Sequence, residues 1–243
     1  MKIYVQGLDG FPAQDWCVSA YMGFRAKGGK LILYEDIEEV PISRDNLLVG
    51  PIDDTIAYFK RLGFTNIPTA MNVPIELKQY AGRELNYMTM GEFRKQTKFP
   101  IFLKPNAIAK EFVAGVMFRA EDVTTIHREV PDDMPVMTSE VVDFVSEYRC
   151  YVINGKLVGI LFYLGDLRVF PDVKVIDAII ADFKTAPAGY GLDVGITSDG
   201  RTLLVECTDG WSIGNYGLED KLYTKLLSAR WVELLNTNNP TIK

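Results

Sequence analysis

The sequence predicts a mixed α/β (α+β) protein in which a small parallel α/β layer precedes a β-rich region. Residues 1–63 alternate short apolar strands with helices, which is the rhythm of a parallel sheet with helical crossovers. From Phe99 onward the apolar runs lie closer together and are joined by tight-turn signals, which indicates antiparallel hairpins. We therefore expect one domain over residues 1–98 and a second over residues 99–243.

The N-terminal elements follow from apolar runs and glycine stops. Strands are expected over residues 1–7, 30–36 and 46–50, and helices over residues 13–29 and 53–63. Each helix ends in glycine, which accepts the left-handed conformation found at helix C-termini. Pro68 and Pro74 then interrupt a mostly polar connector, because proline does not continue a helix.

The later elements are read in the same way. Strands are expected over residues 99–105, 113–118, 141–152 and 157–163, and helices over residues 119–130, 171–185 and 217–235. Asn154 and Gly155 predict a two-residue loop between the last two of these strands, because a type I′ turn needs positive φ at both positions. A further hairpin is expected within residues 190–211, around the Asp199-Gly200 pair.

Composition is that of an ordinary globular protein, with 48% hydrophobic and 24% charged residues in a chain of 243. No apolar run approaches the ~18–20 residues that span a bilayer. The N-terminus also lacks the apolar stretch of a signal peptide. We therefore expect a cytoplasmic protein with no membrane partner.

Cysteine, histidine and net charge limit the chemistry further. The three cysteines form no CxxC pair, and His127 is the single histidine. These counts argue against a zinc site, a Ser-His-Asp triad and a disulfide framework, and they favour a reducing compartment. A net charge of −6 argues against a non-specific nucleic-acid surface, although it leaves room for a local basic cleft.

Residues 190–211 hold two acids around Asp199-Gly200. If this pair is a two-residue type I′ loop, opposed residues have numbers that add up to 399, and Asp193 faces Glu206. Two carboxylates directly opposite one another have Cβ atoms ~5 Å apart and destabilise the strand pair unless something compensates them. The apolar residues expected on the other face are Leu192, Val194, Ile196, Leu203, Val205 and Cys207.

Three compensations would stabilise this acid pair: a nearby arginine or lysine, a shared proton, or a divalent cation. Magnesium fits because it takes oxygen ligands, often one or two carboxylates together with substrate phosphates. Thr208 lies two residues after Glu206, on the same face, and adds a neutral oxygen. The pattern alone leaves the simpler alternative of a salt-bridged surface hairpin open.

Three blocks of the sequence resemble the ATP-grasp superfamily and come in the order that the superfamily shows. FPIFLKP resembles the strand of the first nucleotide-contacting lysine, SEVVDFVSEYR resembles the adenine and ribose hinge, and LDVGITSDGRTLLVECTDG resembles the metal-binding hairpin. KPNAIAKEF, SEYRCYV and VECTDGWSIGNYGL resemble a clade known largely from bacteriophage and bacterial genomes, which is characterised by two arginines and a lysine. The resemblance implies a pre-ATP-grasp domain over residues 1–98 and an ATP-grasp domain over 99–243. The lobes of the latter, 99–142 and 143–243, would enclose the nucleotide.

The resemblance implies nucleotide contacts by two lysines, a hinge and an acid that follows the hinge. The lysines would supply point charges to the phosphates. The hinge would read adenine through its backbone and the Glu140 side chain, and Glu147 would bind the ribose hydroxyls. The expected ATP-binding residues are Lys104, Lys110, Glu140, Val141, Val142, Asp143 and Glu147.

The resemblance also implies metal and catalytic roles. The expected Mg²⁺ ligands are Asp193, Glu206 and Thr208, although the superfamily more often has asparagine at the position of Thr208, and Asp209 is the alternative ligand. The residues expected to serve the transferred phosphoryl group or a substrate carboxylate are Arg149, Arg168 and Lys110. Simpler roles stay open, since Arg149 could pair with Glu147 or compensate the opposed acids, and Lys110 could be a solvated loop residue.

The implied activity is ATP- and Mg²⁺-dependent ligation of a carboxylate to an amine through an acyl-phosphate. Amino acids or a peptide or protein terminus are the expected substrates, in the host cytoplasm if the chain is phage-encoded. The chemistry needs positioning and charge neutralisation rather than a protein nucleophile, which agrees with the lack of a triad. Two alternatives stay open. One is phosphoryl transfer or ligation on a nucleic-acid-linked acceptor, and the other is a non-catalytic nucleotide-binding module, which the departure at Thr208 would explain.

Overall fold

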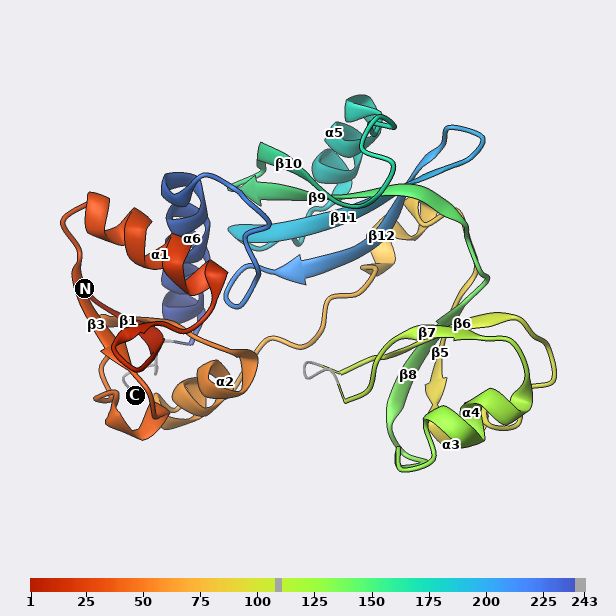
Figure 1. The fold of residues 1–243 in the computed structure, drawn as a ribbon, viewed down its shortest axis with the longest axis horizontal. Coiled ribbons are helices and arrows are strands. Elements are labelled where there is room, and N and C mark those ends of the chain that lie inside the picture. The colour runs from red at the N-terminus through yellow and green to blue at the C-terminus, as the bar shows by residue number, and fades with distance from the viewer. Residues whose placement is uncertain (108–110, 239–243) are drawn as a thin grey trace.

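The computed structural model describes residues 1–107 and 111–238, which form three four-stranded sheets, each with its own core. Figure 1 shows an N-terminal sheet (β1–β4) at one end, a central sheet (β9–β12), and an outer sheet (β5–β8) at the other end. The mixed α/β class predicted from the sequence is confirmed.

The N-terminal sheet is parallel apart from one short strand. Its strands are β1 (Lys2–Leu8), β2 (Phe11–Pro12), β3 (Lys30–Tyr34) and β4 (Asn46–Val49). β1 pairs in parallel with β3 and β4 and antiparallel with β2. The helical segments between the strands are α1 (Asp15–Ala26) and the 3₁₀ helix η1 (Ile37–Glu39), and α2 (Ile52–Arg61) follows β4. The parallel layer predicted for the first sixty residues is confirmed.

The central sheet is antiparallel throughout. Its strands, in spatial order, are β10 (Lys156–Gly165), β9 (Phe144–Ile153), β11 (Gly189–Thr197) and β12 (Thr202–Asp209). Asn154 and Gly155 both have positive φ, 48° and 71°, and form the predicted two-residue loop between β9 and β10. One face of the sheet forms a core with α5 (Val173–Asp182) and the 3₁₀ helix η2 (Ile75–Tyr80).

The outer sheet contains two strands that the sequence did not predict. Its order is β5 (Leu85–Thr89), β8 (Pro135–Ser139), β6 (Ile101–Pro105) and β7 (Gly115–Met117), all antiparallel, with α3 (Met90–Phe93) and α4 (Ala120–Ile126) beside them. β5 and β8 were missed because each is a five-residue segment that mixes apolar and polar residues, and their pairing joins segments about fifty residues apart. β5 precedes the domain boundary expected after residue 98 and pairs with β8 beyond it.

Two short segments join the central and outer sheets within the described residues. They are residues 81–84, which lead from η2 into β5, and residues 140–143, which lead from β8 into β9 (Figure 1). The two segments touch, because the backbone N–H of Glu84 donates a hydrogen bond of 3.2 Å to the Glu140 carboxylate.

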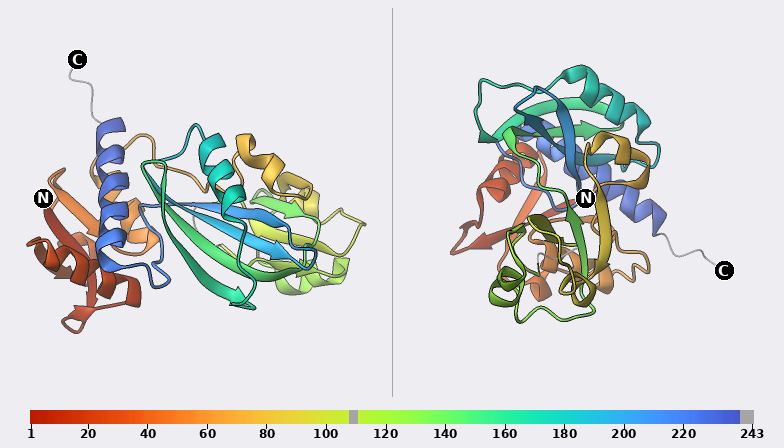
Figure 2. Two further views of the ribbon diagram at one scale, coloured as in Figure 1. Left: turned by 90° about the horizontal axis from the view of Figure 1, so that it is seen from above. Right: turned by 90° about the vertical axis from the view of Figure 1, so that its right-hand side faces the viewer.

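The last helix, α6 (Asp220–Thr237), returns to the N-terminal sheet and lies beside α1, as Figure 2 shows. The ring of Trp231 on α6 packs against that of Phe59 on α2, with the ring centroids 5.1 Å apart and the planes tilted by 34°. Its indole N–H donates a hydrogen bond of 2.8 Å to the carbonyl of Asn46. The N-terminal layer and the C-terminal helix therefore share one core. Among the residues described, none of the helices combines the length and apolar character needed to cross a membrane.

Candidate functional site

A cavity of about 730 Å³ lies where the central and outer sheets face each other. The outer sheet contributes Lys104 from β6, and the central sheet contributes Glu206 and Thr208 from β12. Asn72, in the connector before η2, and Trp211, just after β12, close other sides. This volume falls in the range of ~300–1,000 Å³ that is typical of small-molecule sites.

The turn of the β11–β12 hairpin differs from the prediction. Its loop has three residues, Ser198 to Gly200, and only Gly200 has positive φ (84°), so the predicted two-residue type I′ turn is wrong. The reason is local: the N–H of Gly200 bonds to the carbonyl of Thr197, and the Thr197 hydroxyl accepts the N–H of Arg201 at 3.1 Å. The threonine side chain thereby stabilises a longer loop than the Asp-Gly pair alone indicates.

Asp193 nevertheless faces Glu206, as predicted, because a second irregularity cancels the first. Beyond the loop, Ile196 pairs with Thr202 and Val194 with Leu204, so the register is one residue away from the predicted one. A β-bulge at Val205 then restores it. Because of this shift, the prediction that Leu203 and Val205 lie on the apolar face with Cys207 was wrong for the first two: the core contains Leu204 in their place, whereas Cys207 lies in it as predicted.

Asp193 is compensated by Arg149, its neighbour on β9. The Arg149 guanidinium donates two hydrogen bonds, of 2.7 and 2.6 Å, to the two carboxylate oxygens, and the residues are only 8% and 3% exposed. Burial lowers the pKa of Arg149, but the bonds to Asp193 more than offset this, so the pKa is raised and the group stays charged. Of the two simpler roles considered for Arg149, pairing with Glu147 or compensating the opposed acids, the structure shows the second, through the bonds to Asp193.

Glu206 is compensated from the opposite side of the cavity. The Lys104 ammonium, on the outer sheet, forms an ion pair with the Glu206 carboxylate. Two acids that face one another on the central sheet therefore meet two cations, one from the same sheet and one from the other. Of the three compensations expected from the sequence, the first, a nearby arginine or lysine, is therefore present.

The oxygen atoms around this pair fit a magnesium ion in their chemistry. Two carboxylates and the Thr208 hydroxyl are the hard oxygen donors that Mg²⁺ prefers, and it commonly takes only one or two protein carboxylates. Glu206 and Thr208 line the cavity, whereas Asp193 is held by Arg149 behind them. Within the described ranges, no cluster of three or more acid, histidine or cysteine side chains adds further ligands.

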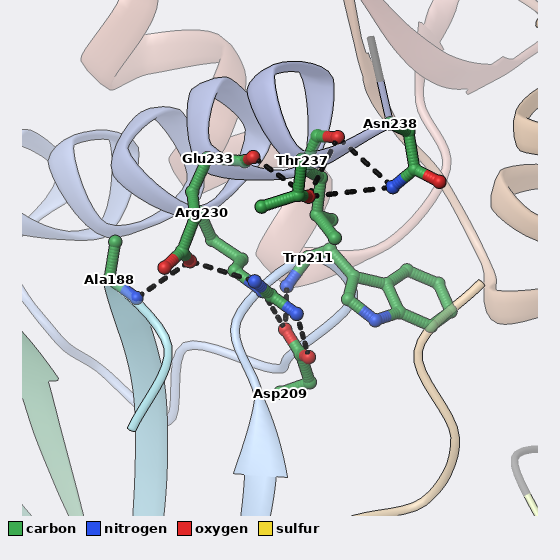
Figure 3. A network of polar contacts seen from close by, with 8 residues as sticks. Ala188, Asp209, Trp211, Arg230, Glu233, Thr237 and Asn238 are labelled. Atoms are coloured by element: carbon green, nitrogen blue, oxygen red, sulfur yellow. Dashed lines mark hydrogen bonds and ion pairs between the residues drawn. The ribbon is translucent and has the colours of Figure 1, made fainter. Parts of the chain in front are cut away.

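Asp209, the alternative metal ligand, is occupied by another partner. Arg230 on α6 donates two hydrogen bonds to its carboxylate, of 2.7 and 2.6 Å, and a third of 2.7 Å to Glu233, as Figure 3 shows. Burial is the largest influence on the pKa of Asp209 and raises it, against the opposing effect of Arg230. Asp209 therefore ties the end of β12 to α6.

The expected hinge residues occupy one of the two connections between the sheets. Residues 140–143 form an irregular segment between β8 and β9, in which Glu140, Val141 and Asp143 are exposed and Val142 is half-buried. Glu147 follows on β9, on the same face as Arg149, and accepts a hydrogen bond of 2.7 Å from the Tyr163 hydroxyl.

Arg168, another expected catalytic residue, is not among the residues that line the cavity. Arg168 lies in the turn after β10 with its side chain 83% exposed, and it pairs with Asp166 at 2.6 Å. Lys110 lies outside the described residues. Their expected roles stay predictions.

Three residues that the sequence analysis did not single out surround the acid pair. The Tyr216 ring lies 4.8 Å from the Arg149 guanidinium carbon and 5.5 Å from the ring of Tyr163. Arg83 donates hydrogen bonds to two backbone carbonyls of β12. Hairpin counting from the Asn154-Gly155 loop places Phe162 opposite Glu147. In the structure two bulges shift the register of β10, so that Leu164 faces Glu147 and Tyr163 is the extra residue of the second bulge. For Arg83 the sequence holds no local signal.

Comparison with known proteins gives one family and a set of similar folds. Residues 80–226, more than half of the chain, match the model of the ATP-grasp domain, R2K clade family 2. The fold is similar to D-alanine–D-alanine ligase from Bacillus anthracis, at 12% identity and a TM-score of 0.59, with 98% of this chain and 97% of that chain covered. It is also similar to D-cycloserine synthetase DcsG (12%, 0.63, 96% and 99%) and to a RimK domain ATP-grasp protein from Sphaerobacter thermophilus DSM 20745 (14%, 0.58, 93% and 99%). The search of curated proteins found no match.

Proposed function

The chain belongs to the ATP-grasp domain family, R2K clade family 2, and from this premise we propose that it is an ATP-dependent ligase that joins a carboxylate to an amine. The similar folds include a D-alanine–D-alanine ligase, a D-cycloserine synthetase and the ATP-grasp ligase PsnB, one structure of which holds a precursor peptide and an ATP analogue. Amino acids and peptide or protein termini are the substrates that we propose for this chain.

The single observation that carries the proposal is the arrangement of four charges, two that line the cavity and two directly behind them. Lys104 reaches from the outer sheet to Glu206 on the central sheet, next to the Arg149–Asp193 pair. Phosphoryl transfer from a nucleotide requires positioned cations and carboxylates around a site shielded from water, rather than a protein nucleophile. The buried thiols of the chain agree with this, because burial raises the pKa of Cys17 to about 12 and makes it a poor nucleophile.

We propose two steps. An oxygen of the substrate carboxylate attacks the γ-phosphorus of ATP, the bond from that phosphorus to ADP breaks, and an acyl-phosphate forms. The amine nitrogen then attacks the acyl carbon, the carbon–oxygen bond to phosphate breaks, and the amide, phosphate and a proton are released. Magnesium, when bound, would neutralise charge on the phosphates.

The residues that we propose for these steps are the ones expected from the sequence. Lys104 would exchange Glu206 for the nucleotide phosphates, with Lys110 as a second cation. Asp193, Glu206 and Thr208 would hold the metal. Arg149, and Arg168 if it approaches the site, would present a planar guanidinium to a carboxylate or phosphoryl group. The segment Glu140–Asp143 and the Glu147 carboxylate would contact adenine and ribose.

An ADP-release screen tests the proposal. The protein is offered ATP, Mg²⁺ and pools of amino acids, peptides or RNA, and products are identified by mass. We expect release that depends on an amino-acid or peptide pool, and we expect Glu206→Gln and Asp193→Asn to abolish it. Asp177→Asn, on the exposed face of α5, is the matched control.

The outcomes separate the alternatives. Unchanged ADP release in both acid variants would contradict the metal assignment. Release that requires RNA would favour a nucleic-acid-linked acceptor. Binding of Mg²⁺ and ATP with no turnover in any pool would make the chain a nucleotide-binding module.

A further inference from the structure

We propose that Arg83 is a positioning residue, which holds the bulge in β12 and thereby keeps Glu206 opposite Asp193 at the cavity. Its consequence for catalysis rests on the proposed function, whereas its consequence for the hairpin does not.

The bulge decides which way Glu206 points. Near the three-residue loop, the residue numbers of two residues that face each other add up to 398, as in the pairs Val194–Leu204 and Ile196–Thr202. If this register continued, Glu206 would pair with Leu192, whose side chain lies in the apolar core. Since a one-residue slip moves every side chain to the other face, Glu206 would be directed away from the cavity. The extra residue, Val205, prevents this.

A bulge leaves backbone groups of the extra residue without ladder partners, so something else must bond to them. Arg83 does so. One of its terminal nitrogens donates to the carbonyl of Leu204 at 2.9 Å, and the other donates to the carbonyl of Val205 at 3.0 Å. Successive carbonyls of a regular strand point to opposite sides, yet here both reach one planar guanidinium. The two terminal nitrogens of Arg83 can therefore bond to both carbonyls in the bulged strand but could not do so in a regular one.

The guanidinium is itself fixed. It donates a third hydrogen bond, of 2.9 Å, to the carbonyl of Ala81, which belongs to the same connection between the sheets. Gly82 has a positive φ of 61°, and a Cβ atom there would lie 2.6 Å from Leu203 Cδ2, so the connection lies directly against β12. Burial is the largest influence on the pKa of Arg83 and lowers it, against the opposing electrostatic effects of Tyr87, Glu147 and Glu206.

Hydrogen exchange and kinetics of three variants test the inference. Arg83→Met removes the guanidinium and its hydrogen bonds to Leu204 and Val205. Arg83→Lys keeps the charge, but its single ammonium cannot bond to both carbonyls in the same plane. Arg61→Met is the matched control, because Arg61 likewise donates to two backbone carbonyls, those of Ile37 and Val40, in the N-terminal layer.

We expect the peptide that covers β12 to exchange about tenfold faster in Arg83→Met and in Arg83→Lys than in the wild type, and at the wild-type rate in Arg61→Met. These measurements need no nucleotide, so they stand even if the ligase proposal fails. Wild-type exchange of β12 in either Arg83 variant would overturn the positioning role.

Where ADP release is observed, we expect kcat in both Arg83 variants to fall by about 100-fold, the scale of a misplacement of roughly 1 Å at a reacting group. The Arg61→Met chain should keep its kcat. Deletion of Val205 gives a further check, since the strands then pair regularly with Glu206 still opposite Asp193, and the exchange effect of Arg83→Met should disappear. An equal effect of Arg83→Met in a folded deletion chain would overturn the link to the bulge.

Discussion

Replacing Arg149 with methionine should destabilise the protein by about 3–5 kcal/mol, because it leaves a buried carboxylate without its partner. The side chains of Arg149 and Asp193 are only 10% and 5% exposed, so water cannot take over the two lost hydrogen bonds. Methionine was chosen because it keeps the apolar stem of the arginine side chain. A loss of this size is a large part of the ~5–15 kcal/mol that stabilises a typical domain.

The loss should depend on pH in a direction that the burial of Asp193 determines. Burial is the largest influence on the pKa of this carboxyl and raises it, and Arg149 opposes that effect in the native chain. Without Arg149, the folded state binds a proton more tightly than the unfolded state, whose carboxyl has a pKa near ~4. The penalty should therefore be complete at high pH and shrink as the pH falls through the raised pKa.

Urea unfolding followed by tryptophan fluorescence measures the effect, because Trp211 and Trp231 lie in the core that also contains Tyr151 of β9. With a slope of about 2–3 kcal/mol per molar, the midpoint should fall by roughly 1–2.5 M. Arg201→Gln, at an exposed ion pair of the hairpin loop, is the control and should leave the midpoint unchanged.

The double variant Arg149→Met with Asp193→Leu decides the cause. Because it removes both charges, it should recover most of the stability that Arg149→Met alone loses. A loss below about 1 kcal/mol in Arg149→Met, or a double variant that is less stable than Arg149→Met, would refute the reasoning.

Two further predictions concern residues outside the acid pair. Because Gly82 and Gly155 both have positive φ, each Gly→Ala variant should lose about 1–2 kcal/mol of unfolding free energy, measured in urea. The Gly82→Ala variant should lose more, because only its new Cβ meets another side chain, that of Leu203, and equal losses would contradict this. His127 is buried, and burial followed by the charge of Arg94 lowers its pKa, so its contribution to stability should be complete above pH ~6.5 and be lost as the pH falls towards the folded pKa. His127→Phe should flatten this part of the stability curve against pH, and a curve parallel to the wild type would count against the assignment.

Local interactions made much of the fold predictable. The glycine-terminated helices of the N-terminal layer and the loop at Asn154-Gly155 depend on backbone preferences of adjacent residues, and both were predicted. β5 and β8 were not predicted, because they are stabilised by pairing with one another and with β6 rather than by a clear local pattern.

The hairpin shows how a correct pairing can follow from an incorrect turn. Asp199-Gly200 predicted a two-residue loop, and the Thr197 hydroxyl selected a three-residue loop instead. Asp193 and Glu206 still face each other because the bulge at Val205 cancels the shift. No neighbouring residue explains that bulge, since the guanidinium that bonds to it comes from Arg83, 122 positions before Val205.

By itself, the sequence determined which side chains could serve the site: two acids on one hairpin, a lysine at the end of a strand, and an arginine two residues after Glu147. Only the tertiary structure decided their partners, bringing Arg149 to Asp193 across 44 positions and Lys104 to Glu206 across 102. The physical reason is that a turn or a helix end is stabilised by neighbours in sequence. The balance of charge in a buried site depends instead on which strands the fold places side by side.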